Sequence, residues 1–438
     1  MDEGCDTISG AKGAGGAGRS VALLNYHWEN VNFGAVLTAY ALNRAVRALG
    51  YDARNIDYVP DFFWIAKEAP NPLFDDFRSK HLPMTRRIRA GEDLSFLNGQ
   101  FSHFLVGSDQ VWRPEFMRDE TDAFLLGFAA ADKCIASYAA SFGTDELALA
   151  PEEREEWRLR LARFDHVTVR EDSAVTLCSN LGIKARQVAD PVFLLRRAEW
   201  EALADEHDPA GTASEDGVVF YTIDPSLKGA IESFVRDNAD TLGTDIAHDV
   251  SWDTSVQEWL WRLSRARFVV TDSFHGSCFA LIFGRPFVCV NRNTKTQTRM
   301  RSLFASFGIE GRLFSRFDEV PPTALSSREI GENDLSAALE RTRLAAMDTL
   351  RAVLSGPCRP VEEKLAAERA LRERLGTSLR AFLGASRFPC LRYRVLSHLC
   401  PEWHGGKYRK KYAALKERRK KALRRLRRLD LASREGGE

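Results

Sequence analysis

A histidine at the start of a predicted helix is the residue of this chain best placed to do chemistry. His275 and Gly276 follow an apolar segment at 268–270, which suits a buried parallel strand, and the helix-capping residues 271–273. In open α/β sheets, ligands bind beyond the carboxyl ends of strands, and a helix N-terminus there favours an anion. A histidine at that point can contact the anion and transfer a proton. The structural alternative is that Ser273 caps the helix while His275 only packs or forms a hydrogen bond.

Polar residues and glycines follow other predicted strands in the same way. Arg170 offers a planar guanidinium that suits a carboxylate or phosphate, and its alternative is an ion pair with Glu171 or Asp172. Asp109 is a candidate general base or a helix cap, and Asp190 is expected to be a turn residue. Glycines at such points let the backbone approach a ligand closely. The further candidate binding residues are Asn32, Gly34, Gly107, Ser108, Ser141, Gly143, Glu171, Ser273 and Gly276.

Strands and helices alternate in two successive series, which predicts an α/β protein. Strands are expected at 21–24, 53–58, 101–106, 135–139, 166–169, 218–222, 268–270 and 287–290, with helices between them. We predict two Rossmann-like, doubly wound domains facing across a cleft, followed by a basic helical tail. The expected division is a disordered lead-in at 1–20, a domain at 21–204, a linker at 205–216, a domain at 217–356 and an extension at 357–438.

Composition limits the classes of function. The chain has 438 residues with a formal net charge of +1, so bulk charge does not indicate a nucleic-acid partner. No apolar run is long enough for a membrane-spanning helix, and residues 1–20 do not read as a signal peptide. None of the eight cysteines forms a CxxC pair, so no metal or redox motif is predicted. The cysteines in apolar segments, Cys134, Cys178, Cys278 and Cys289, are expected to be core thiols in a reducing cytoplasm.

Several motifs together resemble the polysaccharide pyruvyl transferase family. They are NFGAVLTAYAL (32–42), VGSDQVWRP (106–114), SYAASFG (137–143), VREDSAVTL (169–177), ADPVFLL (189–195) and TDSFHGSCFALIFGRPF (271–287). The resemblance covers about residues 21–354. It implies a fold similar to the GT-B glycosyltransferases and transfer of pyruvate from phosphoenolpyruvate onto a sugar as a ketal. It implies no further cofactor and no metal.

The resemblance also suggests roles for individual residues. Arg170 matches an arginine, and His275 a histidine, with which family members hold phosphoenolpyruvate. Lys295 is the candidate for a lysine that serves some members, but residues 291–298 align poorly, so Arg292 or Arg299 could fill that place. In the expected mechanism Arg170 grips the donor, His275 protonates the enol carbon and Asp109 assists the acceptor hydroxyls. N–H groups near 273–277 would receive another oxygen of the donor.

The C-terminal residues 407–429 are predicted to form a basic amphipathic helix. Lys and Arg dominate it, with one acid, Glu417, and its apolar residues share one stripe. Such a helix can lie on an anionic membrane surface, where lipid-linked saccharides would be presented, at the cytoplasmic face. The alternatives are a solvated or coiled-coil helix, or an RNA-attracting tail.

Two other functions compete with pyruvyl transfer. One is a glycosyltransferase that uses a nucleotide sugar on the same fold. The other is a non-catalytic saccharide-binding protein. Retention of Arg170 and His275 speaks against the latter.

Overall fold

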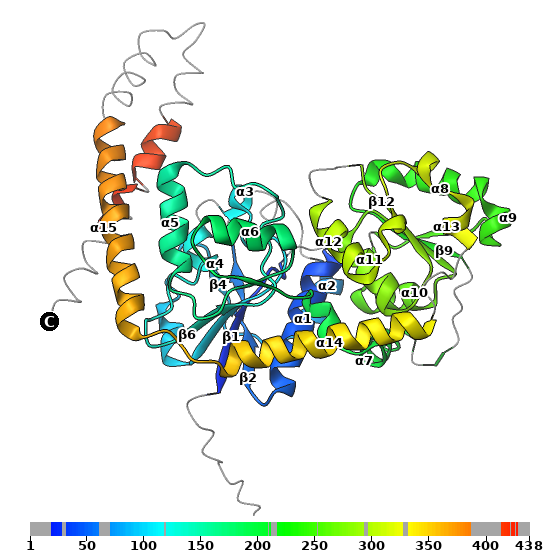
Figure 1. Ribbon diagram of the computed structural model, residues 1–438, viewed down its shortest axis with the longest axis horizontal. Coiled ribbons are helices and arrows are strands. Elements are labelled where there is room, and N and C mark those ends of the chain that lie inside the picture. The colour runs from blue at the N-terminus through cyan, green and yellow to red at the C-terminus, as the bar shows by residue number, and fades with distance from the viewer. Residues whose placement is uncertain are drawn as a thin grey trace, which may run out of the picture. The chain divides into compact units, whose positions relative to one another are not determined.

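The computed structural model describes residues 19–28, 32–60, 71–117, 120–208, 210–211, 217–251, 253–292, 297–326, 332–386, 413–420, 422–424 and 426–427. The chain divides into two compact units. The first comprises Met1–Ala148 and Phe164–Cys358, and the second comprises Leu149–Arg163 and Arg359–Glu438. Both α/β sheets lie in the first unit, but residues 149–163, which the sequence assigned to the domain at 21–204, belong to the second (Figure 1).

The N-terminal half is built on a parallel sheet of order β2-β1-β5-β6. Its strands are β1 (Ser20–Leu24), β2 (Asp52–Asn55), β5 (His103–Val106) and β6 (Cys134–Ser137). Isolated bridges beside β6 continue the edge to β7 (Thr168–Val169), which pairs with β8 (Arg186–Gln187). A separate pair is formed by β3 (Tyr58–Val59) and β4 (Ile88–Arg89). The apolar residues of β1 are fully buried, as expected for a parallel strand covered on both faces.

Helices and short 3₁₀ turns connect these strands. They are α1 (Phe33–Ala48), α2 (Pro72–His81), η2 (Ser95–Gly99), α3 (Pro114–Met117), α4 (Thr121–Phe124), α6 (Asp172–Asn180), η4 (Pro191–Leu194) and α7 (Arg197–Ala204). Helix α1 begins where the Asn32 side chain accepts the N–H of Ala35 at 3.0 Å, and most of its residues are buried. It therefore forms a central element of the unit.

The C-terminal half is built on a second parallel sheet, of order β10-β9-β11-β12-β13. Its strands are β9 (Val218–Tyr221), β10 (Ala247–Asp249), β11 (Phe268–Thr271), β12 (Phe287–Val290) and β13 (Leu313–Phe314). Its helices are η5 (Pro225–Leu227), α8 (Lys228–Asp237), α9 (Ala239–Leu242), α10 (Val256–Arg265), α11 (Phe274–Ile282), α12 (Thr298–Phe307), η7 (Glu310–Arg312), η8 (Phe317–Glu319) and α13 (Pro322–Ser326). The two parallel α/β sheets confirm the predicted fold class.

Helix α14 (Glu332–Ser355) packs against cores of both halves. Leu335, near its start, belongs to the cluster that contains residues of α1, α10 and α11. Ala346 and Leu350, nearer its end, pack with Val21 of β1 in the core of the N-terminal sheet. The sequence assigned this helix to the domain at 217–356, whereas its last turns contact the N-terminal half.

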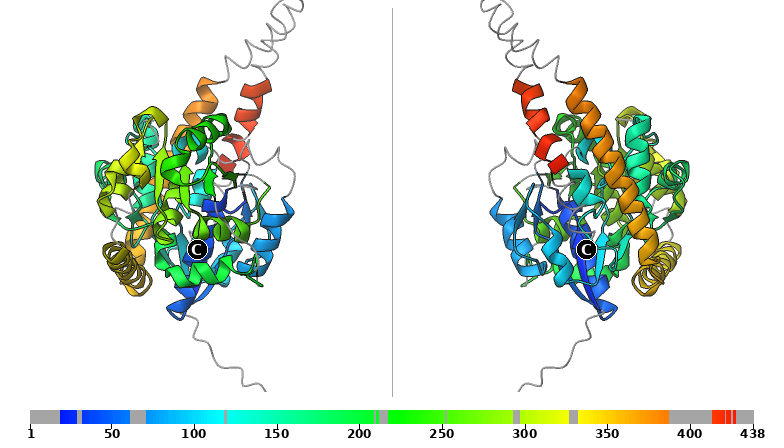
Figure 2. Two further views of the ribbon diagram at one scale, coloured as in Figure 1. Left: turned by 90° about the vertical axis from the view of Figure 1, so that its right-hand side faces the viewer. Right: turned by 90° about the vertical axis from the view of Figure 1, so that its left-hand side faces the viewer.

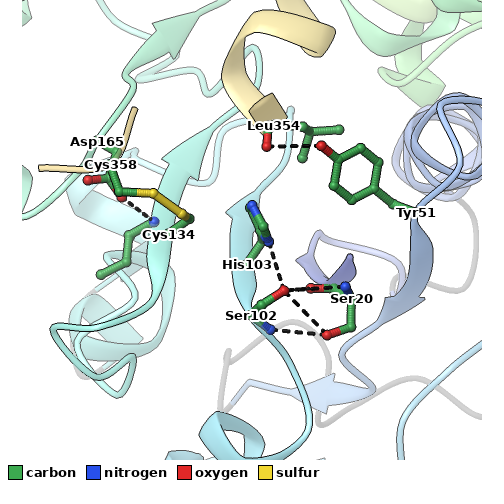
Figure 3. Close-up of a disulfide and its surroundings, with 9 residues drawn as sticks. Ser20, Tyr51, Ser102, His103, Cys134, Asp165, Leu354 and Cys358 are labelled. Atoms are coloured by element: carbon green, nitrogen blue, oxygen red, sulfur yellow. Dashed lines mark hydrogen bonds between the residues drawn. A yellow bond between two sulfur atoms is a disulfide. The ribbon is translucent and has the colours of Figure 1, made fainter. Parts of the chain in front are cut away.

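A disulfide joins the end of the first unit to the N-terminal sheet (Figure 3). Cys134, the first residue of β6, is bonded to Cys358, with their Cα atoms 5.8 Å apart and a sequence separation of 224. The expectation that Cys134 is a free core thiol is therefore wrong, because its partner is too distant in sequence to be recognised from spacing. Cys178, Cys278 and Cys289 are buried and free, as expected.

The carboxylate of Asp165 lies beside these two sulfurs, a grouping whose atoms are close enough to surround a metal ion. The sulfurs are bonded to each other, however, and Asp165 Oδ2 accepts the Ile135 N–H at 2.7 Å. We therefore treat the grouping as part of the disulfide's surroundings.

In the second unit, the residues that the structure describes are mostly helical. α5 (Pro151–Leu161) contacts α15 (Val361–Ala385) through a small cluster of Leu159, Leu371 and Leu375 (Figure 2). Arg163, buried at the end of α5, pairs with Glu368 at 2.9 Å. No helix among the described residues is both long and apolar enough to cross a membrane.

Part of the basic tail is also described. Residues 413–420 are helical, and Arg419 there donates to Leu383 O and Ser386 Oγ near the end of α15. Ala422 of the predicted apolar stripe is buried. Leu415 and Leu426 of the same stripe are half-buried, whereas Tyr408, Tyr412 and Leu429, like most of the predicted lead-in and part of the linker, lie outside the described residues.

Candidate active site

The strand ends of the N-terminal half meet α11 of the C-terminal half around one buried carboxylate, Asp190. Arg170, the first residue after β7, donates from Nη1 to Asp190 Oδ2 at 2.7 Å. Ser108, just after β5, donates its hydroxyl to the same oxygen at 3.0 Å. His275 Nε2 lies 3.7 Å from it. Asp190 also caps η4 by accepting the Val192 N–H, which is the turn role expected from the sequence.

Asp190 is thus the site residue that sequence reasoning missed. A signal was present, because Asp190 lies in the motif ADPVFLL at 189–195. The Asp-Pro pair by itself, however, is typical of a turn. Burial disfavours its charge, yet the neighbouring His275 and Arg170 outweigh burial and lower the pKa of this carboxyl. Asp190 is therefore ionised and orients both predicted donor-binding residues.

Arg170 is buried and still has hydrogen-bonding capacity. Its Nη2 lies 3.6 Å from Asp109 Oδ1 and its Nε lies 3.9 Å from Glu171 Oε2, and neither nitrogen has a hydrogen-bond partner. The guanidinium lies over the ring of Phe274, 4.6 Å from its centroid. Burial alone would lower the pKa of Arg170, but Asp190, Asp109 and Glu171 together raise it. The main partner of Arg170 is the distant Asp190 and not its sequence neighbours.

His275 is the second residue of α11, at the helix start where the sequence predicted it. The residue is 6% exposed, and Nε2 lies 3.1 Å from Thr38 Oγ1 on α1. Gly34, also on α1, is required for this contact, because a Cβ there would overlap the His275 ring. The histidine of one half is therefore held between a threonine and an aspartate of the other.

Asp109 lies beside two guanidinium groups. Its backbone adopts a left-handed conformation with φ of 76°, and its Oδ1 accepts the Gln110 N–H at 2.8 Å. The same oxygen is 3.8 Å from Arg299 Nη1. Asp109 is therefore near the site, as predicted, without a direct hydrogen bond to either arginine.

Arg299, the second residue of α12, brings a further cation to this cluster. Its guanidinium lies 5.8 Å from the Phe274 ring centroid, and its buried Nε has no hydrogen-bond partner. Burial, followed by the nearby charge of Arg170, lowers the pKa of Arg299 to about 10. Of the other two candidates for this place, Arg292 is exposed and Lys295 lies outside the described residues.

Glu171, Ser141 and Gly143 form a supporting network behind Arg170. Glu171 Oε1 accepts the Ser141 hydroxyl at 2.9 Å and the N–H groups of Phe142 and Gly143 at 3.0 and 3.3 Å. Burial raises the pKa of Glu171 despite the opposing charges of Arg170 and Arg299. These residues fix the loops after β6 and β7. Whether they also touch a ligand stays a prediction.

The remaining candidates have visible structural roles. Asn32 caps α1, Ser273 caps α11 by accepting the Gly276 N–H at 3.3 Å, and a Cβ on Gly276 would collide with Thr271. The Ser277 N–H is bonded to the Ser273 carbonyl. Because these N–H groups are engaged, the start of α11 offers an anion fewer donors than predicted. The unpaired N–H groups of Arg170 and Arg299 provide the alternative.

The site therefore combines a buried and a half-buried guanidinium group, a histidine held by Asp190, and three carboxylates. Unpaired donors over an aromatic ring are suited to a small, planar anion. The histidine beside them can give or take a proton.

The family model described as "Polysaccharide pyruvyl transferase" matches residues 32–294 of this chain. The chain belongs to this family. Arg170, Asp190 and His275 all lie in the matched region, as do Asp109 and Gly34. Arg299, which the sequence named as an alternative to Lys295, lies beyond the matched region, and the structure places it beside Phe274.

Several solved structures have a similar fold. UDP-GlcNAc 2-epimerase from Neisseria meningitidis, bound to UDP-GlcNAc, has a TM-score of 0.46 and 12% identity over 76% of this chain and 99% of its own. The epimerase from Methanocaldococcus jannaschii has a TM-score of 0.47 and 12% identity over the same shares of both chains. Phytolacca americana UGT2, complexed with UDP-2fluoro-glucose and pterostilbene, has a TM-score of 0.39 and 8% identity over 81% and 99%. No curated protein matches this pyruvyl transferase family member significantly.

Proposed function

We propose that the protein transfers pyruvate from phosphoenolpyruvate onto a sugar of a surface-polysaccharide precursor, where it forms a cyclic ketal. The observation that carries the proposal is the pair of guanidinium groups of Arg170, which is buried, and Arg299, which is half-buried, with buried nitrogens that have no hydrogen-bond partner. Membership of the polysaccharide pyruvyl transferase family supports the same reaction class.

The charges of the cluster suit an anionic donor. Phosphoenolpyruvate carries a carboxylate and a phosphate, and unpaired guanidinium N–H groups are the donors that such groups accept best. In a buried site those preorganised donors act more strongly than they would in water. Arg170 Nε and Nη2 and Arg299 Nε are assigned to the donor anion, while Arg170 Nη1 stays on Asp190.

His275 is assigned the proton transfer to the enol carbon of the donor. Asp190, ionised beside Nε2, stabilises the imidazolium that must form before this step. Protonation of the methylene carbon gives a methyl group and a cationic centre at C2, which a sugar hydroxyl attacks with loss of its proton. Phosphate then leaves with the C–O bond electrons, and a second hydroxyl, losing its proton, closes the ketal.

Asp109 is assigned to the acceptor hydroxyls. Its carboxylate is near Arg170 and Arg299, at 3.6 and 3.8 Å, and so would lie close to a donor held by both arginines. The sequence of steps requires no electron transfer, and we write it without a cofactor or metal.

Calorimetry with phosphoenolpyruvate tests the donor assignment, with UDP-glucose and UDP-GlcNAc titrated in parallel. We expect phosphoenolpyruvate to bind and the Arg299→Ala variant to lose most of that affinity. Arg316→Ala, which removes an exposed arginine paired with Asp318, is the matched control. Binding of a nucleotide sugar without binding of phosphoenolpyruvate would replace the proposal with the glycosyltransferase alternative. Phosphoenolpyruvate-dependent phosphate release with a sugar acceptor would exclude a merely saccharide-binding protein.

The proposal includes a peripheral contact between the C-terminal extension and an anionic membrane that presents a lipid-linked acceptor. Its support is charge: Lys416, Arg418, Lys420 and Arg424 are exposed in the described helical part, against the single acid Glu417. Basic residues near such a surface contribute about 1 kcal/mol each, and salt weakens them. Deletion from residue 407 should abolish co-sedimentation with phosphatidylserine vesicles at low salt. Equal sedimentation of both proteins would leave the packing of Arg419 and Ala422 as the role of this segment.

A further inference from the structure

Asn25 is a buried amide without a hydrogen-bond partner. It is the first residue after β1, and its side chain is enclosed, since the residue is only 3% exposed. Neither Oδ1 nor Nδ2 forms a hydrogen bond. Buried polar groups are rarely left in this state, and a ligand is one of the partners that can complete them.

Gly107 creates the space in which this amide lies. β1 and β5 are neighbouring parallel strands, paired at Leu24 and Val106, and the Gly107 N–H donates to the Leu24 carbonyl at 2.9 Å. The amide lies so close over Gly107 that a Cβ at that position would overlap Nδ2. Glycine is therefore needed here for the close approach of Asn25, beyond any role of its own.

The position of Asn25 places it next to the donor cluster. Two residues beyond Gly107 is Asp109, near Arg170 and Arg299, and between them Ser108 donates to Asp190. Along the carboxyl edge of the sheet, Asn25 follows β1, the Asp109 loop follows β5, and Arg170 follows β7. Asn25 therefore lies on the β1 side of the residues assigned to the donor anion.

The chemistry of the amide distinguishes its ligand from the donor. An uncharged amide both donates and accepts hydrogen bonds, whereas carboxylate and phosphate oxygens only accept. Hydroxyl groups both donate and accept hydrogen bonds, so they can satisfy both Oδ1 and Nδ2 of the Asn25 amide. We propose that Asn25, seated over Gly107, binds hydroxyl groups of the saccharide acceptor beside the anion site. This assignment rests on the proposed function, which supplies a saccharide as the second substrate.

Saturation-transfer difference NMR tests the proposal directly. The probes are the 4-nitrophenyl glycosides of β-galactose, β-glucose, α-mannose and β-N-acetylglucosamine, each with phosphoenolpyruvate present. With wild type, at least one glycoside should give a saturation-transfer difference signal. In Asn25→Ala, the intensity of that signal should fall at least fivefold. Asn180→Ala, at the exposed end of α6, is the matched control and should behave as wild type. If Asn25→Ala does not fold, Asn25→Asp, which keeps the shape and loses the N–H donors, should also weaken the signal.

The two levels of the argument fail separately. Unchanged glycoside signals in the folded Asn25 variants, or no signal from wild type with any of the four glycosides, would overturn the Asn25 assignment. Calorimetry with phosphoenolpyruvate should give the same affinity for wild type and Asn25→Ala. If wild type gives glycoside signals but does not bind phosphoenolpyruvate, the proposed donor is wrong and the saccharide contact of Asn25 is still supported.

Discussion

The amino ends and the carboxyl ends of the strands form two opposite edges of the N-terminal sheet. The two edges differ in whether the polar side chains there have hydrogen-bond partners. At the amino edge, Ser102 donates to the Ser20 carbonyl at 3.0 Å, His103 Nδ1 lies 2.9 Å from the Ser102 hydroxyl, and Cys134 is in a disulfide (Figure 3). At the carboxyl edge, buried nitrogens of Arg170 and Asn25 have no hydrogen-bond partner.

This difference indicates how the sheet separates stability from function. At the amino edge, hydrogen bonds and the disulfide connect the strands with each other and with the chain that follows α14. The Tyr51 hydroxyl adds a hydrogen bond to the Leu354 carbonyl of α14 at 3.1 Å. Open donors at the carboxyl edge cost stability and are expected where a ligand completes them. Substitutions at the two edges should therefore affect different measurements.

The largest expected effect is the loss of turnover in His275→Ala. Removal of a positioned acid should lower phosphoenolpyruvate-dependent phosphate release by about 10²–10⁴-fold. The melting temperature should change little, because the side chain sits among polar residues of the carboxyl edge. A variant that releases phosphate at the wild-type rate would contradict the assignment of His275.

The reverse pattern is expected for Cys134→Ser at the amino edge. Loss of a disulfide that closes a loop of more than 200 residues should lower the free energy of unfolding by about 2–5 kcal/mol. Phosphoenolpyruvate affinity at 25 °C should remain that of wild type. As an internal control, a reducing agent should destabilise wild type and leave the melting temperature of Cys134→Ser unchanged. Equal melting temperatures for oxidised and reduced wild type would show that the disulfide does not fasten this edge.

A smaller effect is expected from Arg170→Lys. The lysine keeps a positive charge for Asp190 but cannot reproduce the planar guanidinium, so phosphoenolpyruvate binding should weaken by about 1.5–3 kcal/mol. Calorimetry measures this change directly. Undiminished affinity would mean that the anion binds elsewhere and that Arg170 only stabilises the carboxyl edge.

The smallest expected effect is a pH dependence at the amino edge. Burial lowers the pKa of His103 in the folded protein below its ordinary value of 6.5. The unfolded chain therefore binds more protons as pH falls below about 7, so the His103 contribution to stability is lost from there downward. The lowered pKa of Asp190 has a different consequence, because its contribution is lost only below about pH 4. In urea titrations, His103→Gln should flatten the decline between about pH 7 and 5, and an identical slope in both proteins would contradict this account.

Local signals in the sequence identified much of the site. Alternating strand and helix patterns located β11, α11 and β12, because periodicity and capping depend on residues only a few positions apart. The same reasoning selected His275 and Arg170. It treated Asn32 and Ser273 as binding candidates, although their cap chemistry is what the structure shows.

The sequence by itself determined the alternation of elements and the family resemblance, and it supplied the strand-end residues that we propose hold an anion. Only the tertiary structure decided that Asp190 joins Arg170 to His275, that Arg299 and Asn25 keep buried side-chain atoms without hydrogen-bond partners, and that Cys134 meets Cys358. Thr38 and His275 are 237 residues apart, and the two cysteines are 224 apart. Contacts at such separations leave no periodic or spacing signal in one sequence, because they arise only when both sheets and the helices between them have packed.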